Sequence, residues 1–297
     1  MATAQAAVIA PTVIPPEQAS LWSDAWRRLR RNRLALIGAV YLAFLVAVAI
    51  AGAIHTPYRY TEVDVGIPYT GPSGQHWLGV DELGRDTFSR LMIGAQISLI
   101  VGVGTQVVVL AIGVPLGLAA GYFRGWFDQV VTFVINIFYG IPNLLVALIL
   151  VFLLGPSLIN IIIAIAATGW TDMARLVRGQ TLSIREREFV EAARASGAKP
   201  IKILFGHILP NALGPIIVQA TFGVPQAILF EAFLSFLGLG VPPPTPSWGS
   251  MAAEGIVTMR IAPVMVLAPS IALSLTLMAF NFLGDGLRDA LDPRSRR

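Results

Sequence analysis

The sequence predicts an all-α membrane protein, and three observations lead to this fold class. Only 13% of the 297 residues are charged and 55% are hydrophobic, whereas about 25% of residues are charged in a typical soluble domain. Residues 34–54, 91–123, 129–171 and 261–284 carry no charge at all. Uncharged apolar runs longer than about 18 residues are typical of membrane-spanning helices, since a helix satisfies its own backbone in lipid.

Six membrane spans are predicted. They lie at residues 34–54, 95–121, 128–154, 157–174, 211–239 and 262–284. Gly155-Pro156 separates the third from the fourth, which is short for a complete crossing. Four prolines within the spans are expected to kink or break their helices, namely Pro115, Pro142, Pro225 and Pro269.

The distribution of basic residues supports the short fourth span. With six spans, 17 of the 21 Lys and Arg residues fall on one side of the membrane. Basic residues concentrate on the cytoplasmic side, so both termini are predicted to be cytoplasmic. Without the span at 157–174, the loop 175–210 and its seven basic residues would lie outside. The predicted organisation is a tail and interfacial helix at 1–33, a first span and external loop at 34–94, a core domain at 95–284, and a C-terminal segment at 285–297.

The N-terminal region predicts contact with membrane lipid. Residues 1–19 contain three prolines and no basic residue, so we interpret them as a disordered tail rather than a signal peptide. Residues 20–33 carry five arginines, with Trp22, Trp26 and Leu29 on one helical face. This pattern is typical of an amphipathic helix on an anionic membrane surface. A simple positive-inside anchor for the first span is the alternative. The external segments 55–94 and 240–261 are either a docking surface or solvated connectors.

Several classes of function find no support in the sequence. There is no cysteine, and His55, His76 and His207 are far apart, so no metal site is predicted. No phosphate-binding Gly-rich loop and no nucleophile–base or paired-carboxylate pattern stands out. We therefore predict a non-catalytic chain without a bound cofactor. The basic residues follow the predicted topology, which argues against nucleic acid as a partner.

A charged island interrupts the apolar sequence at residues 185–197. Phe189, Ala192, Ala193 and Ser196 recur at helical spacing and predict a short helix with a narrow face of small residues. Gly197 suits the left-handed position that ends a helix. Lys199-Pro200 then prevents the same helix from continuing, and a second amphipathic piece follows at 201–207.

The spacing in and after this island resembles a known family. Glu191-Ala192-Ala193, then Gly197 and Leu209-Pro210, are similar to the EAA loop of the membrane subunits of binding-protein-dependent ABC importers. Further segments resemble the C-type permease of dipeptide and oligopeptide importers, namely 77–90, 234–240, 248–249, 282–289 and 291–294. Val80, Gln96 and His207 depart from the family pattern.

The resemblance implies a type I ABC importer permease fold in the cytoplasmic (inner) membrane. It implies four further subunits or proteins of three kinds: a homologous second permease, two ATP-binding subunits that hold ATP and Mg, and an external substrate-binding protein. The loop 175–210 would carry the helix that contacts an ATPase cleft. The implied coupling residues are Arg187, Glu188, Phe189, Glu191, Ala192, Ala193, Arg194 and Gly197.

Polar residues inside the expected spans are candidates for the substrate path. Glu231 stands out because ionisable groups in a membrane usually face a cavity or a partner. Pairing with a group of the partner subunit, or a protonated structural role, is its alternative. Asn136 and Asn143 are further path candidates, although interhelical hydrogen bonding is the commoner use of such groups.

The expected function is ATP-driven import of di- or oligopeptides. Within the same class, a nickel chelate or glutathione is an alternative cargo. Outside it, the alternatives are an ATP-independent channel, an ion-driven secondary transporter and a membrane scaffold. A channel would need a filter-like loop, which the sequence lacks, and a secondary transporter would need charge relays inside its spans.

Overall fold

The computed structural model describes residues 21–291, and within that range the chain forms helices and loops without a named β-strand. The predicted tail 1–19 and the last six residues lie outside the described residues. The helices in chain order are α1 (Leu21–Leu29), α2 (Arg33–Ile54), α3 (Thr87–Phe123), α4 (Gly125–Tyr139), α5 (Asn143–Leu154), α6 (Leu158–Ile184), α7 (Glu188–Ala195), α8 (Pro200–Ile203), a π-helical turn η1 (Leu204–Ile208), α9 (Leu209–Phe236), α10 (Trp248–Val257) and α11 (Val264–Leu291).

Four helices are long and apolar enough to cross a membrane: α2, α3, the continuous helix Pro200–Phe236 and α11. A fifth crossing is obtained if α4 and α5 count as one bent span. Helix α6 has 27 residues, but its second half carries Asp172, Arg175 and Arg178. The all-helical class is therefore confirmed for the described residues, with four or five apolar spans.

The predicted third span at 128–154 is broken into α4 and α5 next to Pro142, where a kink or break was expected. The chain bends by 89° between α4 and α5. Pro142 has no backbone N–H and disfavours the helical conformation for Ile141. Gly140 accordingly closes α4, and its N–H donates to Asn136 O at 3.2 Å and Ile137 O at 3.0 Å. A new helix then begins at Asn143.

Two boundaries in the segments that were expected to be external also differ from the prediction. Helix α3 begins at Thr87, eight residues before the expected start at 95, because the Asp86 carboxylate accepts from Ser89 N and caps the helix. The segment 240–261 was expected to be a loop, but it contains α10. Ser247 and Ser250 form a reciprocal capping box at the start of this helix.

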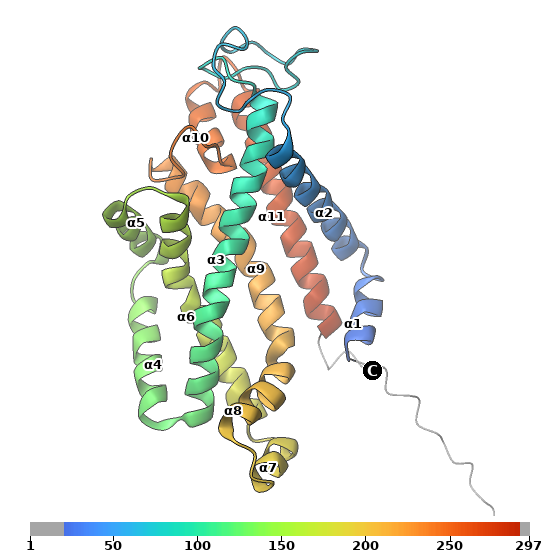
Figure 1. The fold of residues 1–297 in the computed structure, drawn as a ribbon, viewed down its shortest axis with the longest axis vertical. Helices are drawn as coiled ribbons and strands as arrows, with labels where there is room; N and C mark the ends of the chain where they lie inside the picture. Colours follow the sequence, from blue (N-terminus) through green and yellow to red (C-terminus); the bar gives the residue numbers. More distant parts are fainter. Residues whose placement is uncertain (1–20, 292–297) are drawn as a thin grey trace, which may run out of the picture.

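The helices form one elongated bundle (Figure 1). α3 packs against α6 on one side and α9 on another, while α11 lies beside α2, α9 and α10. Loop 55–86 and α10 lie at one end, and α7 lies at the other (Figure 1). α1 lies against α11 near the α7 end. Its Trp26 is exposed, and Arg30 lies over the Trp26 ring at 4.7 Å.

Close packing of α3 on α6 depends on a row of glycines. Gly113, Gly117 and Gly121 recur at four-residue spacing on α3. A Cβ atom at Gly117 would lie 2.6 Å from the backbone oxygen of Ala174 and 2.7 Å from Val177 Cβ. The two backbones therefore approach as in small-residue contacts of membrane helices. This contact continues into an apolar core that also contains Ile203 and Ile208.

Candidate coupling surface and polar sites

The charged island folds into α7, as the residue pattern predicts. Arg187 is extended before the helix, and Gly197 follows it with φ at +77°. Gly197 N donates to Arg194 O at 3.0 Å, and Ala198 N donates to Ala193 O at 3.1 Å. The left-handed Gly197 thus ends the helix in the expected way. A second helix begins at Pro200, so the break at Lys199-Pro200 is also confirmed.

One residue anchors α7 to the bundle and the opposite face stays exposed. Val190 is 0% exposed and belongs to the same apolar core as Ile203 and Ile208. Of the predicted small-residue face, Ala193 is half-buried against this core. The exposed members of the predicted set are Arg187, Glu188, Phe189, Glu191, Ala192, Arg194, Ser196 and Gly197. α7 is therefore held on one side and open on the other.

The segment after α7 continues directly into a long apolar helix. α8, η1 and α9 together run from Pro200 to Phe236. The turn at Leu204–Ile208 has π-helical hydrogen bonding, which the sequence did not predict. The Asn211 side-chain amide donates to His207 O at 2.7 Å just after this turn. One continuous helix thus extends from the segment after α7 to Phe236.

Arg185 fixes the start of the island against another part of the chain. Its guanidinium donates to Tyr122 O at 2.6 Å and to Gly121 O at 3.3 Å. The end of α6 is therefore level with the end of α3, where the turn into α4 begins. The Arg185–Tyr122 contact therefore marks the position along the bundle at which both α3 and α6 end, close to α7.

Glu231 lies inside this chain, between α9 and α10. Its side chain is 0% exposed. Oε1 accepts from Ser235 Oγ at 2.7 Å and from Ser247 Oγ at 2.6 Å. A Cβ at Gly249 would lie 3.1 Å from Oε2, so the glycine leaves room for the carboxylate. These contacts within the chain favour a structural role over the path-lining role and over pairing with a partner subunit.

The two asparagines occupy different settings. Asn136 is exposed on α4, and its Oδ1 accepts from Arg175 at 3.2 Å. Asn143 is half-buried at the first position of α5, just after the bend. Beside Asn136, the Tyr139 hydroxyl donates to Asp172, and Arg175 stacks over the Tyr139 ring at 3.9 Å from its centroid.

Tyr139, Asp172 and Arg175 were not predicted as site residues from the sequence. Asp172 falls inside the predicted fourth span, so its position in an apolar run was an available signal. The hydrogen bond between Tyr139 and Asp172 could not be predicted from the sequence, because it depends on α4 lying beside α6.

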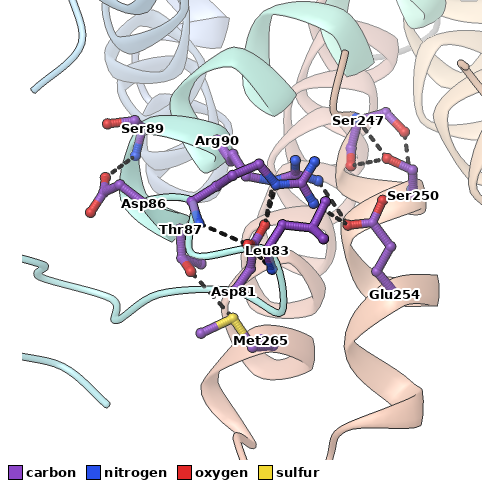
Figure 2. Close-up of polar contacts among 11 residues, drawn as sticks. Asp81, Leu83, Asp86, Thr87, Ser89, Arg90, Ser247, Ser250, Glu254 and Met265 are labelled. Atoms are coloured by element: carbon purple, nitrogen blue, oxygen red, sulfur yellow. Dashed lines mark hydrogen bonds and ion pairs between the residues drawn. The ribbon is translucent and has the colours of Figure 1, made fainter. Parts of the chain in front are cut away.

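A buried ion network joins the start of α3 to α10 at the opposite end of the bundle (Figure 2). Arg90 is 2% exposed and donates to Glu254 Oε2 at 2.7 Å. Arg90 Nε also lies 3.4 Å from Asp81 Oδ2, which accepts from Arg85 Nε at 2.7 Å. Burial raises the pKa of Glu254, and the nearby Arg90 and Arg85 oppose this rise. The network fastens loop 55–86 and the start of α3 to α10.

The loop that supplies this network is held by a second pair. Asp86 Oδ1 lies 2.9 Å from His76 Nδ1, while its Oδ2 caps α3. Asp81 Oδ1 accepts from the backbone N–H groups of Leu83 and Arg85, both at 2.9 Å. Asp81 and Asp86 thus bind groups of this loop and of the start of α3. Their roles were not predicted from the sequence.

Comparison with known proteins identifies the class. Residues 113–297, more than half of the chain, match the family model described as the binding-protein-dependent transport system inner membrane component. Residues 20–72 match the N-terminal TM domain of oligopeptide transport permease C. Over 68% of its length, the chain also superposes on 96% of a chain from the inward-facing MetNI methionine ABC transporter. The TM-score is 0.57 at 22% identity, so this likeness concerns the fold alone.

Curated relatives place the chain more narrowly. It is 47% identical to the dipeptide transport system permease protein DppC of Bacillus subtilis, over 94% of this chain and 87% of the relative. It is 42% identical to the oligopeptide permease OppC of the same organism, over 96% and 93%. It is 44% identical to the glutathione transport system permease GsiD of Escherichia coli, over 98% and 96%.

The chain belongs to the binding-protein-dependent ABC transport permeases, in the branch of the dipeptide and oligopeptide permease C subunits. It is a multi-pass protein of the inner membrane and a non-catalytic permease subunit. ATP hydrolysis in such systems is carried out by partner subunits.

Proposed function

We propose that this chain is the transmembrane subunit of an importer that uses ATP to move di- or oligopeptides across the cytoplasmic membrane. The similarity to dipeptide and oligopeptide permeases supports this cargo. The comparable similarity to a glutathione permease supports glutathione, itself a short peptide, as the second candidate. The complex would contain a second permease, two ATP-binding subunits that hold ATP and Mg, and an external binding protein.

The proposed topology has six spans with both termini in the cytoplasm. α4 and α5 together would form the bent third span. α6 would form the fourth, because 27 residues extend about 40 Å and exceed a hydrocarbon core of about 30 Å. The seven basic residues of 175–210 then lie on the cytoplasmic side, in agreement with the positive-inside bias.

The observation that carries the coupling proposal is the exposed face of α7 on a buried anchor. Val190 fixes the helix to the core, and the outward face offers an aromatic ring, small residues and both signs of charge. We assign ATPase contact to Arg187, Glu188, Phe189, Glu191, Ala192, Ala193, Arg194 and Gly197. Phe189 would supply the apolar contact, and Ala192 would allow close approach of the ATPase.

Coupling would proceed through the rigid connection of α7 to the spans. Closure of the ATPase dimer on ATP would move α7 and, through the core around Ile203, the continuous helix from Pro200 to Phe236. This movement would favour an outward-facing arrangement over an inward-facing one. ATP and the loaded binding protein need only bias two states of similar free energy.

The proposal is tested with Glu191→Lys in the co-expressed complex. Reversing this exposed charge should reduce co-purification of the ATPase subunits and lower peptide uptake at least tenfold, while the chain stays in the membrane. Glu62→Lys is the matched control, since Glu62 is exposed in the external loop. Normal co-purification and uptake with Glu191→Lys would overturn the coupling assignment. Uptake that persists in wild-type vesicles without ATP would instead support a channel or a secondary transporter.

A further inference from the structure

A polar cluster lies between α4 and α6, and it is separate from the Asp128–Arg178 ion pair on the same two helices. It consists of Asn136 and Tyr139 on α4, and Asp172 and Arg175 on α6. Asn136, Tyr139 and Arg175 are exposed and Asp172 is half-buried. Both signs of charge are therefore accessible from one side of the chain.

The cluster lies far along the bundle from the end at which α3 and α6 terminate. The contact of Arg185 with Tyr122 O sets the level at which α3 and α6 end. Arg175 precedes Arg185 by ten residues and Asp172 precedes it by thirteen. At 1.5 Å per residue, these positions lie about 15 and 20 Å from that level. Tyr139 lies at the far end of α4, about 21 Å from Gly125.

Exposing such a cluster of charged and polar side chains to lipid is energetically unfavourable. Charged side chains inside a membrane face the bundle interior, a partner or a water-filled cavity. The residues on the neighbouring face of α4 show the contrast, because Phe133 and Ile137 are exposed and apolar. α4 thus has a lipid-compatible face and, next to it, a face that needs polar surroundings.

The cluster also has unused hydrogen-bonding capacity. Arg175 is held by one neutral acceptor, Asn136 Oδ1, and by the Tyr139 ring. Among the described residues it makes no ion pair with a carboxylate. A guanidinium has five N–H donors, so most of them remain open. Asp172 accepts from Tyr139, and a carboxylate can accept about three further bonds.

The neighbouring Asp128–Arg178 pair is different. Arg178 Nη2 donates to Asp128 Oδ2 at 2.8 Å, and Arg178 Nε donates to Oδ1 of the same carboxylate. Its charges are satisfied within the chain. The open donors and acceptors of Asp172 and Arg175 therefore stand out from the adjacent ion pair on the same two helices.

We propose that Asn136, Tyr139, Asp172 and Arg175 face the translocation path and bind the charged ends of a short zwitterionic peptide. Asp172 accepts from the ammonium group, Arg175 donates to the carboxylate, and Asn136 contacts the peptide group between them. Residues three apart on a helix have Cβ atoms about 5–6 Å apart, which is close to the reach of about 7 Å for two extended residues. The cluster has no net charge, like its ligand. This inference rests on the proposed function and adds a site to it.

Cysteine labelling tests the exposure of the cluster to water. The natural chain has no cysteine, so each variant carries a single thiol. In the assembled complex in lipid nanodiscs, Asn136→Cys should react with a charged, membrane-impermeant thiol reagent at least tenfold faster than Ile137→Cys. Ile137 is the matched control because it is one residue away on the exposed apolar face. Equal rates would overturn the proposal.

Peptide dependence tests the ligand. Binding protein loaded with dialanine, together with ATP and vanadate, should slow labelling of Asn136→Cys, and an unchanged rate would overturn the assignment. In uptake assays, Asp172→Asn and Arg175→Gln should raise the half-saturating dialanine concentration at least tenfold, with stimulated ATPase activity retained. Glu62→Gln should behave as wild type. Loss of the second permease on purification of either cluster variant would mean a subunit contact, contrary to the proposal.

The outcomes separate this site from the function on which it rests. If the wild-type complex imports no dipeptide, no oligopeptide and no glutathione, the proposed function fails. The labelling contrast between Asn136→Cys and Ile137→Cys still decides whether the cluster faces water.

Discussion

Gly117→Ala is predicted to destabilise the bundle by forcing α3 away from α6. The new Cβ would lie 2.6 Å from Ala174 O, 2.7 Å from Val177 Cβ and 3.0 Å from Arg178 N. Ordinary contacts begin at 3.4 Å, so relief of the closest contact needs a shift of about 0.8 Å. Two of the three neighbouring atoms are backbone and cannot rotate away. Overpacking of this kind costs about 1–3 kcal/mol.

The assay is thermal unfolding of the purified complex, followed by tryptophan fluorescence, with Gly179→Ala as the control. Gly179 lies on α6, and a Cβ there would meet nothing within 4 Å. Both substitutions gain about the same helix propensity, so their difference isolates the clash. At about 2–4 °C per kcal/mol, Gly117→Ala should unfold roughly 2–12 °C below Gly179→Ala. Equal transition temperatures would refute the close-packing argument.

Two further predictions concern the half-buried Glu254 and the buried Glu231. Burial raises the pKa of Glu254 above its usual 4.5, so its contribution to stability is greatest below pH 4.5 and declines as pH rises through the folded-state pKa. The unfolding temperature of the wild type minus that of Glu254→Gln should therefore fall across this range, and a difference independent of pH would contradict the assignment. Glu231→Gln keeps an acceptor for Ser235 and Ser247 and should leave uptake kinetics unchanged, whereas Glu231→Leu strands both hydroxyls at a cost of about 1–3 kcal/mol each. Changed cargo preference with Glu231→Gln would restore the path-lining role.

The positions of several spans could be predicted because long uncharged apolar runs indicate membrane helices. α2 begins one residue before the predicted first span and ends with it. The bend near Pro142 could not be placed from hydropathy, which has no directional information. Pro115, Pro225 and Pro269 lie inside continuous helices, whereas the chain turns at Gly140–Pro142. The sequence signal at each proline is similar, and the surrounding packing decides the outcome.

Local features of the coupling segment were predictable for a different reason. The end of α7 follows from the left-handed preference of Gly197, which depends on one residue and its neighbours. By contrast, the anchor Val190 was not singled out, since its burial depends on α8 and α9 folding back beneath α7. The Arg90–Glu254 contact joins residues 164 positions apart. Long-range pairs of this kind need the tertiary arrangement, and α10 was missed because its capping signal, Ser247 and Ser250, is short.

The central claim is that the exposed face of α7 receives the movement of an ATPase in a peptide importer. Its most direct test is Ala192→Cys as the single thiol of this chain, with a short bifunctional cross-linker, in the complete reconstituted complex. We predict an adduct with the ATP-binding subunit, and loss of ATP-dependent dialanine uptake after cross-linking. Glu62→Cys, at the opposite end of the bundle, should give neither. A complex that imports dialanine with ATP but forms no ATPase adduct through Ala192→Cys would contradict the claim.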